Sequence, residues 1–140
     1  MPAFSMQDTT YAKKTYTTAE TQLLVEIDGW ISEEAWQAVP WEGDFQMHQP
    51  YDDRPPTQET QFKVMYDKDH LYVGIRAFDT APDSIVSRLT RRDDIDGDMV
   101  AFVIDSYHDL QTGFVFLVSV AGSKADFYMS GDGSNEDPTW

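Results

Sequence analysis

Two apolar stretches, Met99-Val100-Ala101-Phe102-Val103-Ile104 and Phe114-Val115-Phe116-Leu117-Val118, decide the fold of this chain. Each is apolar on both faces, which is typical of the central strands of a packed sheet. The short segment 107–113 joins them, so we predict two neighbouring strands. Residues 124–129 are a candidate for a further strand, and residues 130–138, rich in Gly, Asp, Ser, Asn and Pro, are expected to form a loop.

The residues before this pair predict an antiparallel β-hairpin. Residues 57–66 and 71–78 have strand-like sequences, and the Asp-rich segment 67–70 between them predicts a turn. The first strand alternates between two faces, which hold Phe62, Val64 and Tyr66 on one side and Gln61, Lys63 and Met65 on the other. One face of the second strand holds Leu71, Val73, Ile75 and Ala77.

The N-terminal part of the chain has weaker signals. Residues 1–20 are Thr-rich without apolar periodicity, so we expect a flexible segment or one that lies along a sheet edge. Residues 23–27 form a short apolar run that predicts a strand. A short helix is expected around Trp36, with Ser32 as its N-cap and Pro40 as its end.

No strand–helix–strand rhythm appears, so the expected fold class is all-β. We predict an antiparallel β-sandwich of the immunoglobulin or jelly-roll kind with one short helix, formed by residues 21–140 after the N-terminal segment 1–20. The expected strands are few for a sandwich, and the chain stops at Trp140 directly after a loop. The sequence therefore favours a domain truncated at its C-terminus.

Composition excludes several classes of function. The 140 residues hold 10 Lys and Arg against 25 Asp and Glu, a net charge of −15, which excludes a nucleic-acid-binding protein and docking on anionic membranes. A 41% apolar and 14% aromatic composition excludes a disordered acidic tail. No apolar run approaches the ~20 residues of a membrane helix, so no membrane insertion is expected. The start of the chain lacks the pattern of a signal peptide.

Catalytic signatures are missing from the sequence. Cysteine is absent, which excludes disulfides, thiolate metal sites and cysteine nucleophiles. The three histidines, His48, His70 and His108, have no spacing that links them, and the common nucleophile and phosphate-binding motifs are absent. Carboxylates are frequent, but no pair stands out as a glycosidase pair. We therefore predict that the chain is not an enzyme.

The densest chemical feature is a run of carboxylates at alternate positions. Asp94, Asp96 and Asp98, with Gly97 between the last two, offer hard oxygen ligands of the kind that calcium prefers. A second acidic cluster holds Asp132, Asn135, Glu136 and Asp137. The alternative for both clusters is a solvated acidic turn. The sequence thus predicts calcium as a structural cofactor at Asp94, Asp96 and Asp98, without a complete EF-hand pattern.

Exposed aromatic side chains are a possible sugar-binding feature. The C–H faces of a sugar ring stack on an aromatic ring while hydroxyl groups meet polar side chains. The aromatics that suit this role are Trp41, Tyr51, Tyr107 and Trp140. The alternative is that each of them belongs to the core or its margin.

Several short motifs occur together in order. Asp28-Gly29 followed by Glu33-Glu34-Ala35-Trp36, the strand pair 60–67 and 71–79, and the strand 98–105 resemble the pattern of family 9 carbohydrate-binding modules. The likeness spans roughly residues 23–140. Further motifs resemble a subfamily at the N-terminus of large bacterial envelope proteins of uncharacterised function: Arg91-Arg92-Asp93-Asp94, Asp105 with Asp109, Thr112-Gly113 with Phe116, and Asp137 with Trp140.

The resemblance implies an antiparallel β-sandwich, glycan binding and often bound calcium. In sugar-binding members of the family, two tryptophans clamp a terminal sugar and an arginine assists them. Arg76 lies on a strand similar to the one that supplies that arginine, and Trp140 matches the second clamp residue. The chain departs from the family where 91–97 lacks an aromatic residue and where Ala101 replaces a glutamate.

These observations predict a non-catalytic module that binds an oligo- or polysaccharide. It would be the N-terminal part of a larger secreted, periplasmic or outer-membrane protein, whose remaining domains would be its partners. The expected sugar contacts are Arg76, Trp140, Tyr107 and Trp41. The alternatives are a structural module that docks on the rest of its own chain without binding sugar, and an accessory domain of a glycoside hydrolase.

Overall fold

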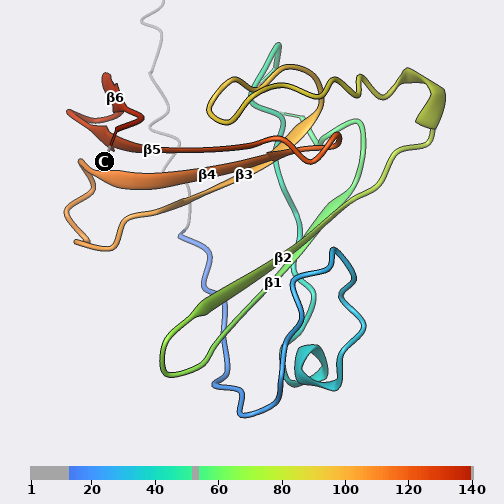
Figure 1. Ribbon diagram of the computed structural model, residues 1–140, viewed down its shortest axis with the longest axis vertical. Coiled ribbons are helices and arrows are strands. Elements are labelled where there is room, and N and C mark those ends of the chain that lie inside the picture. Colours follow the sequence, from blue (N-terminus) through green and yellow to red (C-terminus); the bar gives the residue numbers. More distant parts are fainter. Residues whose placement is uncertain (1–12, 52–53, 140) are drawn as a thin grey trace, which may run out of the picture. The chain divides into compact units, whose positions relative to one another are not determined.

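The computed structural model describes residues 13–51 and 54–139 of the chain. Its strands and 3-10 helices are, in order, η1 (Glu34–Ala38), β1 (Thr60–Tyr66), β2 (Leu71–Ala77), η2 (Pro82–Ser84), β3 (Met99–Ile104), β4 (Gly113–Ser119), β5 (Lys124–Ser130) and β6 (Asn135–Asp137) (Figure 1). The predicted all-β class is confirmed: the structure has antiparallel sheets of two and four strands and, among the described residues, no helix beyond these short 3-10 turns.

The chain divides into two compact units. The first contains the described residues up to Asp44 together with Gln61–Arg76, and the second contains those of Phe45–Thr60 and Ala77–Trp140. The first unit therefore holds η1 and nearly all of the β1–β2 hairpin, and the second holds the four-stranded sheet.

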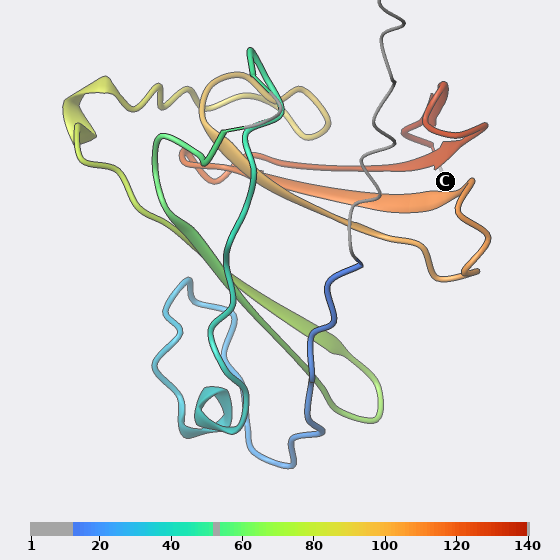
Figure 2. The same cartoon turned by 180° about the vertical axis from the view of Figure 1, so that it is seen from behind.

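The predicted hairpin and its turn are confirmed in the first unit (Figure 2). The backbone N–H of Asp67 donates to the carbonyl of His70 at 3.0 Å. The Asp67 carboxylate accepts hydrogen bonds from the N–H groups of Asp69 at 2.8 Å and His70 at 2.7 Å. An Asp side chain that bonds to the backbone just after it is a common way to close a turn, so the Asp-rich sequence explains this link.

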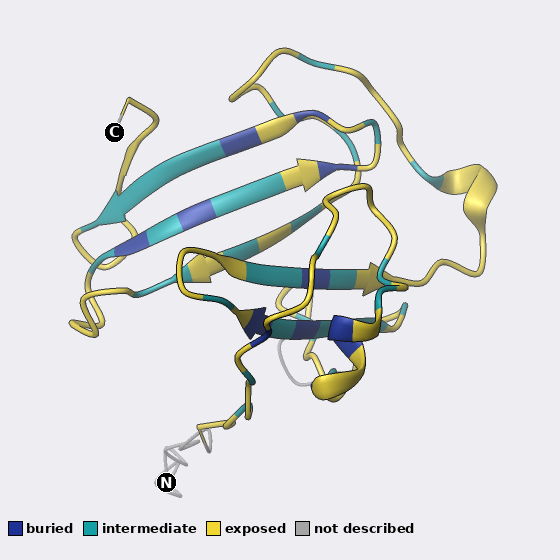
Figure 3. Ribbon diagram, turned by 60° about the horizontal axis from the view of Figure 1, so that its bottom comes forward, coloured by how far each residue is buried: buried dark blue, intermediate teal, exposed yellow. Residues whose placement is uncertain are grey.

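The core of the first unit forms where η1 packs on the hairpin. Its buried residues are Ala35, Trp36, Val39 and Met65, and Tyr16, Ala19, Val25, Ile31 and Tyr72 pack against them. Figure 3 colours the ribbon of buried residues dark blue. On β2, Gly74 lets this cluster approach closely, because a Cβ there would meet Ile31 at 2.9 Å and Trp36 at 3.3 Å. The face of the hairpin on the cluster therefore includes Met65 and Tyr72 rather than the apolar Phe62 and Val64.

The outer edge of β1 is covered by the N-terminal segment. Glu20 forms a parallel bridge with Tyr66, and the N–H of Thr21 donates to the Tyr66 carbonyl at 2.7 Å. Farther along the strand, Glu42 forms an antiparallel bridge with Phe62. Residues 13–20, expected to be flexible or to lie along a sheet edge, thus run beside β1, while residues 1–12 lie outside the described part of the chain.

Two expectations for the segment before η1 are wrong. Residues 23–27 form no strand, and Leu24 and Ile27 are 80% and 84% exposed; only Val25 packs against the core. Ser32 does not cap the helix, because the N-cap is Glu33. The Glu33 carboxylate instead accepts the N–H groups of Glu26 and Ser32, both at 3.0 Å, which ties this segment to η1.

The second unit contains an antiparallel sheet with the strand order β3-β4-β5-β6. The predicted pairing of the two apolar stretches is confirmed: Phe102 lies opposite Phe116, and their rings stack with centroids 5.0 Å apart. Of the two, only β4 is an inner strand. β3 is an outer strand of this sheet with alternating exposed and half-buried residues, so its predicted two-faced burial is wrong.

The C-terminal segment differs from the predicted loop. Residues 135–137 form the short strand β6, in which Glu136 lies opposite Met129 of β5. The preceding turn contains Gly131, Asp132 and Gly133, all with positive φ, which suits the tight reversal between β5 and β6. Residues 135–137 are a strand because the tight turn places them beside β5, and their polar sequence does not indicate this.

Candidate functional site

Trp41 and Arg76, two of the four predicted sugar contacts, lie together in the first unit. Trp41 follows η1 and Pro40, and its neighbour Glu42 is held on Phe62 of β1 by backbone hydrogen bonds of 2.7 and 3.0 Å. Arg76 lies near the end of β2, and its guanidinium carbon is 4.4 Å from the centroid of the Trp41 ring. Trp41 is half-buried and Arg76 is exposed, so the pair is accessible to a ligand.

A second cation approaches the same ring. The Nζ of Lys63 lies 5.0 Å from the Trp41 centroid and donates a hydrogen bond of 2.5 Å to the carbonyl of Trp36. Lys63 is 8% exposed, although it lies on a strand whose sequence places it opposite the apolar residues. Burial, and then the positive charge of Arg76, lower the pKa of Lys63 from its ordinary value. The sequence pattern alone does not indicate a functional role for this residue.

Both cations of this cluster lie on an aromatic ring and have no acidic partner among the described residues. Within the described part of the chain, neither Lys63 nor Arg76 forms an ion pair. Elsewhere Lys14 pairs with Asp44 at 2.8 Å and Arg88 with Asp96 at 2.6 Å. The cluster of Trp41, Lys63 and Arg76, called here the Trp41 site, is therefore a local positive site on an aromatic surface.

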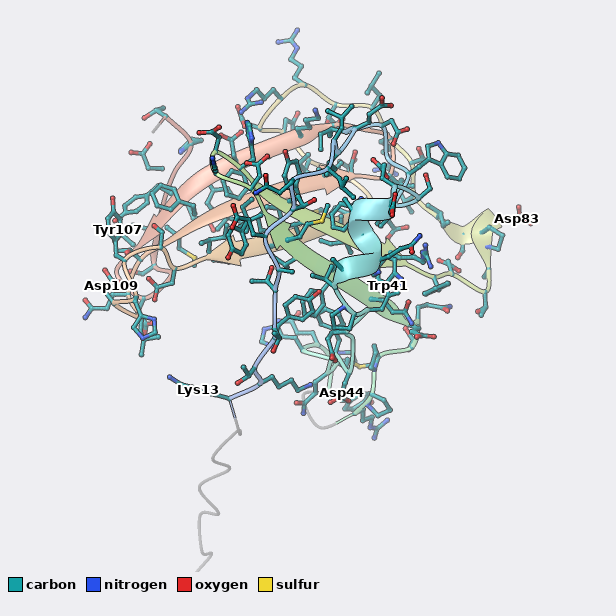
Figure 4. All side chains as sticks on the ribbon, turned by 90° about the horizontal axis from the view of Figure 1, so that it is seen from below. Lys13, Trp41, Asp44, Asp83, Tyr107 and Asp109 are labelled. Carbon is teal, nitrogen blue, oxygen red and sulfur yellow. The ribbon has the colours of Figure 1, made fainter. Side chains whose placement is uncertain are left out.

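The other two predicted sugar contacts lie outside the first unit or outside the described residues. Tyr107 belongs to the second unit, where it lies on the loop between β3 and β4, 67% exposed and with its ring 6.2 Å from that of Phe114. Figure 4 labels Trp41 and Tyr107 on their separate elements. Trp140 lies outside the described residues. Within the first unit, the structure brings together the predicted contacts Trp41 and Arg76.

The carboxylates proposed for calcium have other partners. Asp96 pairs with Arg88, and a carboxylate oxygen of Asp98 accepts the N–H of Val86 at 2.8 Å. Within residues 13–51 and 54–139, no group of three or more acidic or histidine side chains is arranged to hold a metal ion. Asp96 and Asp98 thus have partners within the chain, and the calcium site at Asp94, Asp96 and Asp98 remains a prediction from sequence.

The second acidic cluster also serves the local backbone. The carboxylate of Asp137 accepts hydrogen bonds from the N–H of Thr139 at 2.8 Å and from its hydroxyl at 2.6 Å. These bonds lower the pKa of Asp137 from its ordinary value. These bonds hold the chain directly after β6, and the two interpretations of the cluster remain predictions.

Two surface hollows are lined by residues other than those of the Trp41 site. One, of about 290 Å³, is in the second unit and is lined by Asp93, Ile95, Leu117, Ala125, Asp126, Phe127, Glu136 and Pro138. The other, of about 250 Å³, is in the first unit and is lined by Glu20, Thr21, Gln22, Leu23, Asp67, Lys68 and Asp69. Neither contains an aromatic side chain that was predicted to contact sugar.

The acid with the most strongly displaced pKa is Asp67 in the hairpin turn. Hydrogen bonds from the Tyr72 hydroxyl at 2.7 Å and from the N–H groups of Asp69 and His70 lower the pKa of Asp67 to about 2. A carboxyl whose pKa is lower in the folded state stabilises the fold above its unfolded pKa of about 4, and this contribution is lost as the pH falls through the folded value. The charged form of Asp67 therefore favours the hairpin at neutral pH.

We expect Asp67→Asn to make the stability of the protein less dependent on pH in the acidic range. Between about pH 5 and about pH 2 the Tm of the variant should fall less than that of the wild type, because the neutral amide has no proton to take up. Thermal melts at several pH values measure this. Asp69→Asn is the control, since it removes a neighbouring charge without removing these hydrogen bonds. Parallel pH profiles for the wild type and Asp67→Asn would contradict the assignment.

Comparison with known proteins gives no relative for this chain. No protein-family model matches it, and neither a curated protein nor a solved structure shows significant similarity. Among the described residues there is no helix of the length and apolar character needed to cross a membrane. The functional interpretation therefore rests on the residues and geometry of the chain itself.

Proposed function

We propose that this chain is a non-catalytic carbohydrate-binding module, similar to family 9 modules, and that it binds sugar at the Trp41 site. The observation that carries the proposal is the 4.4 Å contact between the Arg76 guanidinium and the Trp41 ring. We further propose that the module belongs to a larger secreted or envelope protein that binds oligo- or polysaccharides.

The chemistry of the pair suits a sugar. The indole ring of Trp41 offers an apolar surface for the C–H face of a pyranose, and the N–H groups of Arg76 can donate to hydroxyl groups beside that surface. The backbone bonds between Glu42 and Phe62 hold the segment that carries Trp41. A site held in place in this way loses less conformational entropy when a ligand binds.

The composition of the Trp41 site supports binding rather than hydrolysis. Hydrolysis of a glycosidic bond commonly uses two carboxyl groups placed on either side of that bond. The side chains that gather at Trp41 are cations, Lys63 and Arg76. The proposal therefore assigns this site recognition of sugar without a chemical step.

One observation favours a second function, that of an interaction module docking on the rest of its own protein. The segment 23–30 exposes four large apolar side chains: Leu23, Leu24, Ile27 and Trp30 are 52%, 80%, 84% and 74% exposed. Exposed apolar side chains that are close in the chain are common at protein–protein contacts. In this second function the module would bind protein and no glycan.

We expect Trp41→Ala to lower the affinity for a bound glycan by at least about tenfold, because an aromatic anchor at a binding site commonly contributes more than ~1.4 kcal/mol. Arg76→Ala should weaken binding in the same direction. A glycan array identifies the ligand, and titration calorimetry with wild type and variants measures the change. Trp30→Ala is the matched control, since Trp30 is 74% exposed and lies outside the Trp41 site.

The outcomes separate the two functions. Binding that is lost in Trp41→Ala and kept in Trp30→Ala supports the carbohydrate site. An array without any bound glycan, obtained with protein that shows a cooperative melting transition, would exclude it and leave the interaction module. Binding that survives both substitutions would place the sugar elsewhere on the chain.

A further inference from the structure

We infer that the sugar at the Trp41 site carries a carboxylate, so that the ligand is a glycan containing uronic acid. This inference rests on the proposed carbohydrate-binding function and narrows its ligand to a chemical class. The observation behind it is that the Arg76 guanidinium and the Lys63 ammonium approach one indole ring, at 4.4 and 5.0 Å, without an acidic partner in the described part of the chain.

What distinguishes the two cations of the Trp41 site is that both approach the same aromatic ring. Acidic residues outnumber basic ones by 25 to 10, so a carboxylate partner is easily supplied by the sequence. Arg88 and Arg92 both have such partners, in Asp96 and Asp126. Lys63 and Arg76 instead share an aromatic ring, which attracts cations but does not neutralise them.

The two positive charges also act on each other. Burial first, and then the charge of Arg76, lower the pKa of Lys63, as expected for two cations near one ring. An anion bound beside the indole ring would relieve this repulsion. Lys63 is buried, and its ammonium donates a hydrogen bond to the Trp36 carbonyl. Its positive charge would therefore attract a bound anion without touching it.

Arg76 is the group that would contact the anion. Its side chain is exposed, and a planar guanidinium can bind both oxygens of a planar carboxylate through parallel hydrogen bonds. A uronic acid has such a carboxylate at the edge of a pyranose ring. The guanidinium covers part of the indole ring. A pyranose that stacks on the exposed part of Trp41 has its carboxylate edge beside the guanidinium, so one sugar residue contacts both side chains.

The net charge of the chain limits the kind of acidic glycan. At −15 the protein repels a long polyanion, but this repulsion is screened beyond about 8 Å at physiological salt, whereas contacts at the Trp41 site are much shorter. A single uronic acid in an otherwise neutral glycan therefore fits the charge distribution better than a polyuronate.

The test compares sugars that differ only in this group. Cellobiouronic acid is measured against cellobiose, and digalacturonic acid against its methyl ester, by titration calorimetry on the full chain. We expect the acid of at least one pair to bind about tenfold more tightly than its neutral partner, as for hydrogen bonds assisted by charge. Arg76→Gln, which keeps hydrogen-bond donors but loses the charge, should bring this ratio close to one.

Arg88→Gln serves as the control, because it removes the same charge from an arginine outside the Trp41 site. It should leave the ratio of acid to neutral affinity unchanged. A second variant, Lys63→Met, should lower the ratio, and its thermal melt shows whether it folds; Arg76→Gln decides the question if it does not. An unchanged ratio in Arg76→Gln would overturn the inference.

The result also separates this inference from the function on which it rests. Suppose that acidic and neutral sugars bind equally well and that Trp41→Ala abolishes this binding. The preference for uronic acid would then be wrong, while the carbohydrate-binding function would stand. Absence of binding by every sugar, on the array and in these titrations, would overturn both.

Discussion

Replacing Trp36 with alanine is expected to lower the free energy of unfolding by about 3–5 kcal/mol, the usual cost of removing a large aromatic side chain from a core. Trp36 is 5% exposed and is the largest member of the buried cluster with Ala35, Val39 and Met65. A domain of ordinary stability has only about 5–15 kcal/mol in total. The variant should therefore be close to unfolded at room temperature.

Urea denaturation followed by far-UV circular dichroism measures this loss. Trp36→Phe keeps part of the buried surface and gives a measurable transition if the alanine variant does not fold. Trp30→Ala removes the same side chain from a position that is 74% exposed, and it should change the stability by no more than about 0.5 kcal/mol. Equal losses in Trp30→Ala and Trp36→Ala would show that the cluster around η1 is not the core of this unit.

The strands were predictable because their signals are local. The Asp-rich turn at 67–70 and the apolar stretches of β3 and β4 each specify a hairpin within a few residues of sequence. The observed β1, β2, β3, β4 and β5 begin and end within three residues of the expected positions. β6 was missed because its three residues are polar and exposed, and only the register of β5 makes them a strand.

The failed strand at 23–27 has a different cause. An apolar run becomes a strand only where a partner strand offers free backbone groups. The outer edge of β1 pairs with Glu20 and Glu42, whereas the segment 23–27 is held to η1 by the N–H of Glu26 on the Glu33 carboxylate. Leu24 and Ile27 remain exposed as a result. Which segment pairs with the edge of a sheet depends on the whole fold and cannot be deduced from the sequence of residues 23–27 alone.

Which face of the hairpin is buried also depends on contacts that are distant in the sequence. Alternation divides β1 into two faces without deciding which is buried, and the buried residues of β1 are Lys63 and Met65. The burial of Lys63 depends on the Trp36 carbonyl, which accepts a hydrogen bond from its ammonium and belongs to a residue far earlier in the chain. A lysine in a strand carries no local sign of such a partner.

The candidate site was predictable only in part, because some of its residues are defined by burial and not by sequence. Trp41 and Arg76 were identified from their residue types and from the resemblance, and the structure places them in contact. Lys63 was missed because its role follows from burial. Tyr107 and Trp41 were grouped by residue type alone, and the structure assigns them to different units.

The second large effect is expected for Gly97→Ala, at the entrance to β3. Gly97 has a φ of +95°, and a Cβ there would lie 2.2 Å from the carbonyl oxygen of Val86. That oxygen already accepts the N–H of Asp98 at 3.0 Å, so the added methyl group would displace a backbone hydrogen bond. Backbone strain and steric overlap together should cost about 2–4 kcal/mol.

Gly122→Ala separates the two contributions to this cost. Gly122 has a similar φ of +85°, but a Cβ at this position would have no atom within 4 Å, so its substitution adds strain without overlap. We expect it to cost about 1 kcal/mol, clearly less than Gly97→Ala in the same urea denaturation experiment. The carbonyl of Asp98 also accepts the N–H of Val120, so displacement at Gly97 should extend into the sheet. Equal losses in the two variants would mean that the close approach of Val86 to Gly97 does not constrain the chain before β3.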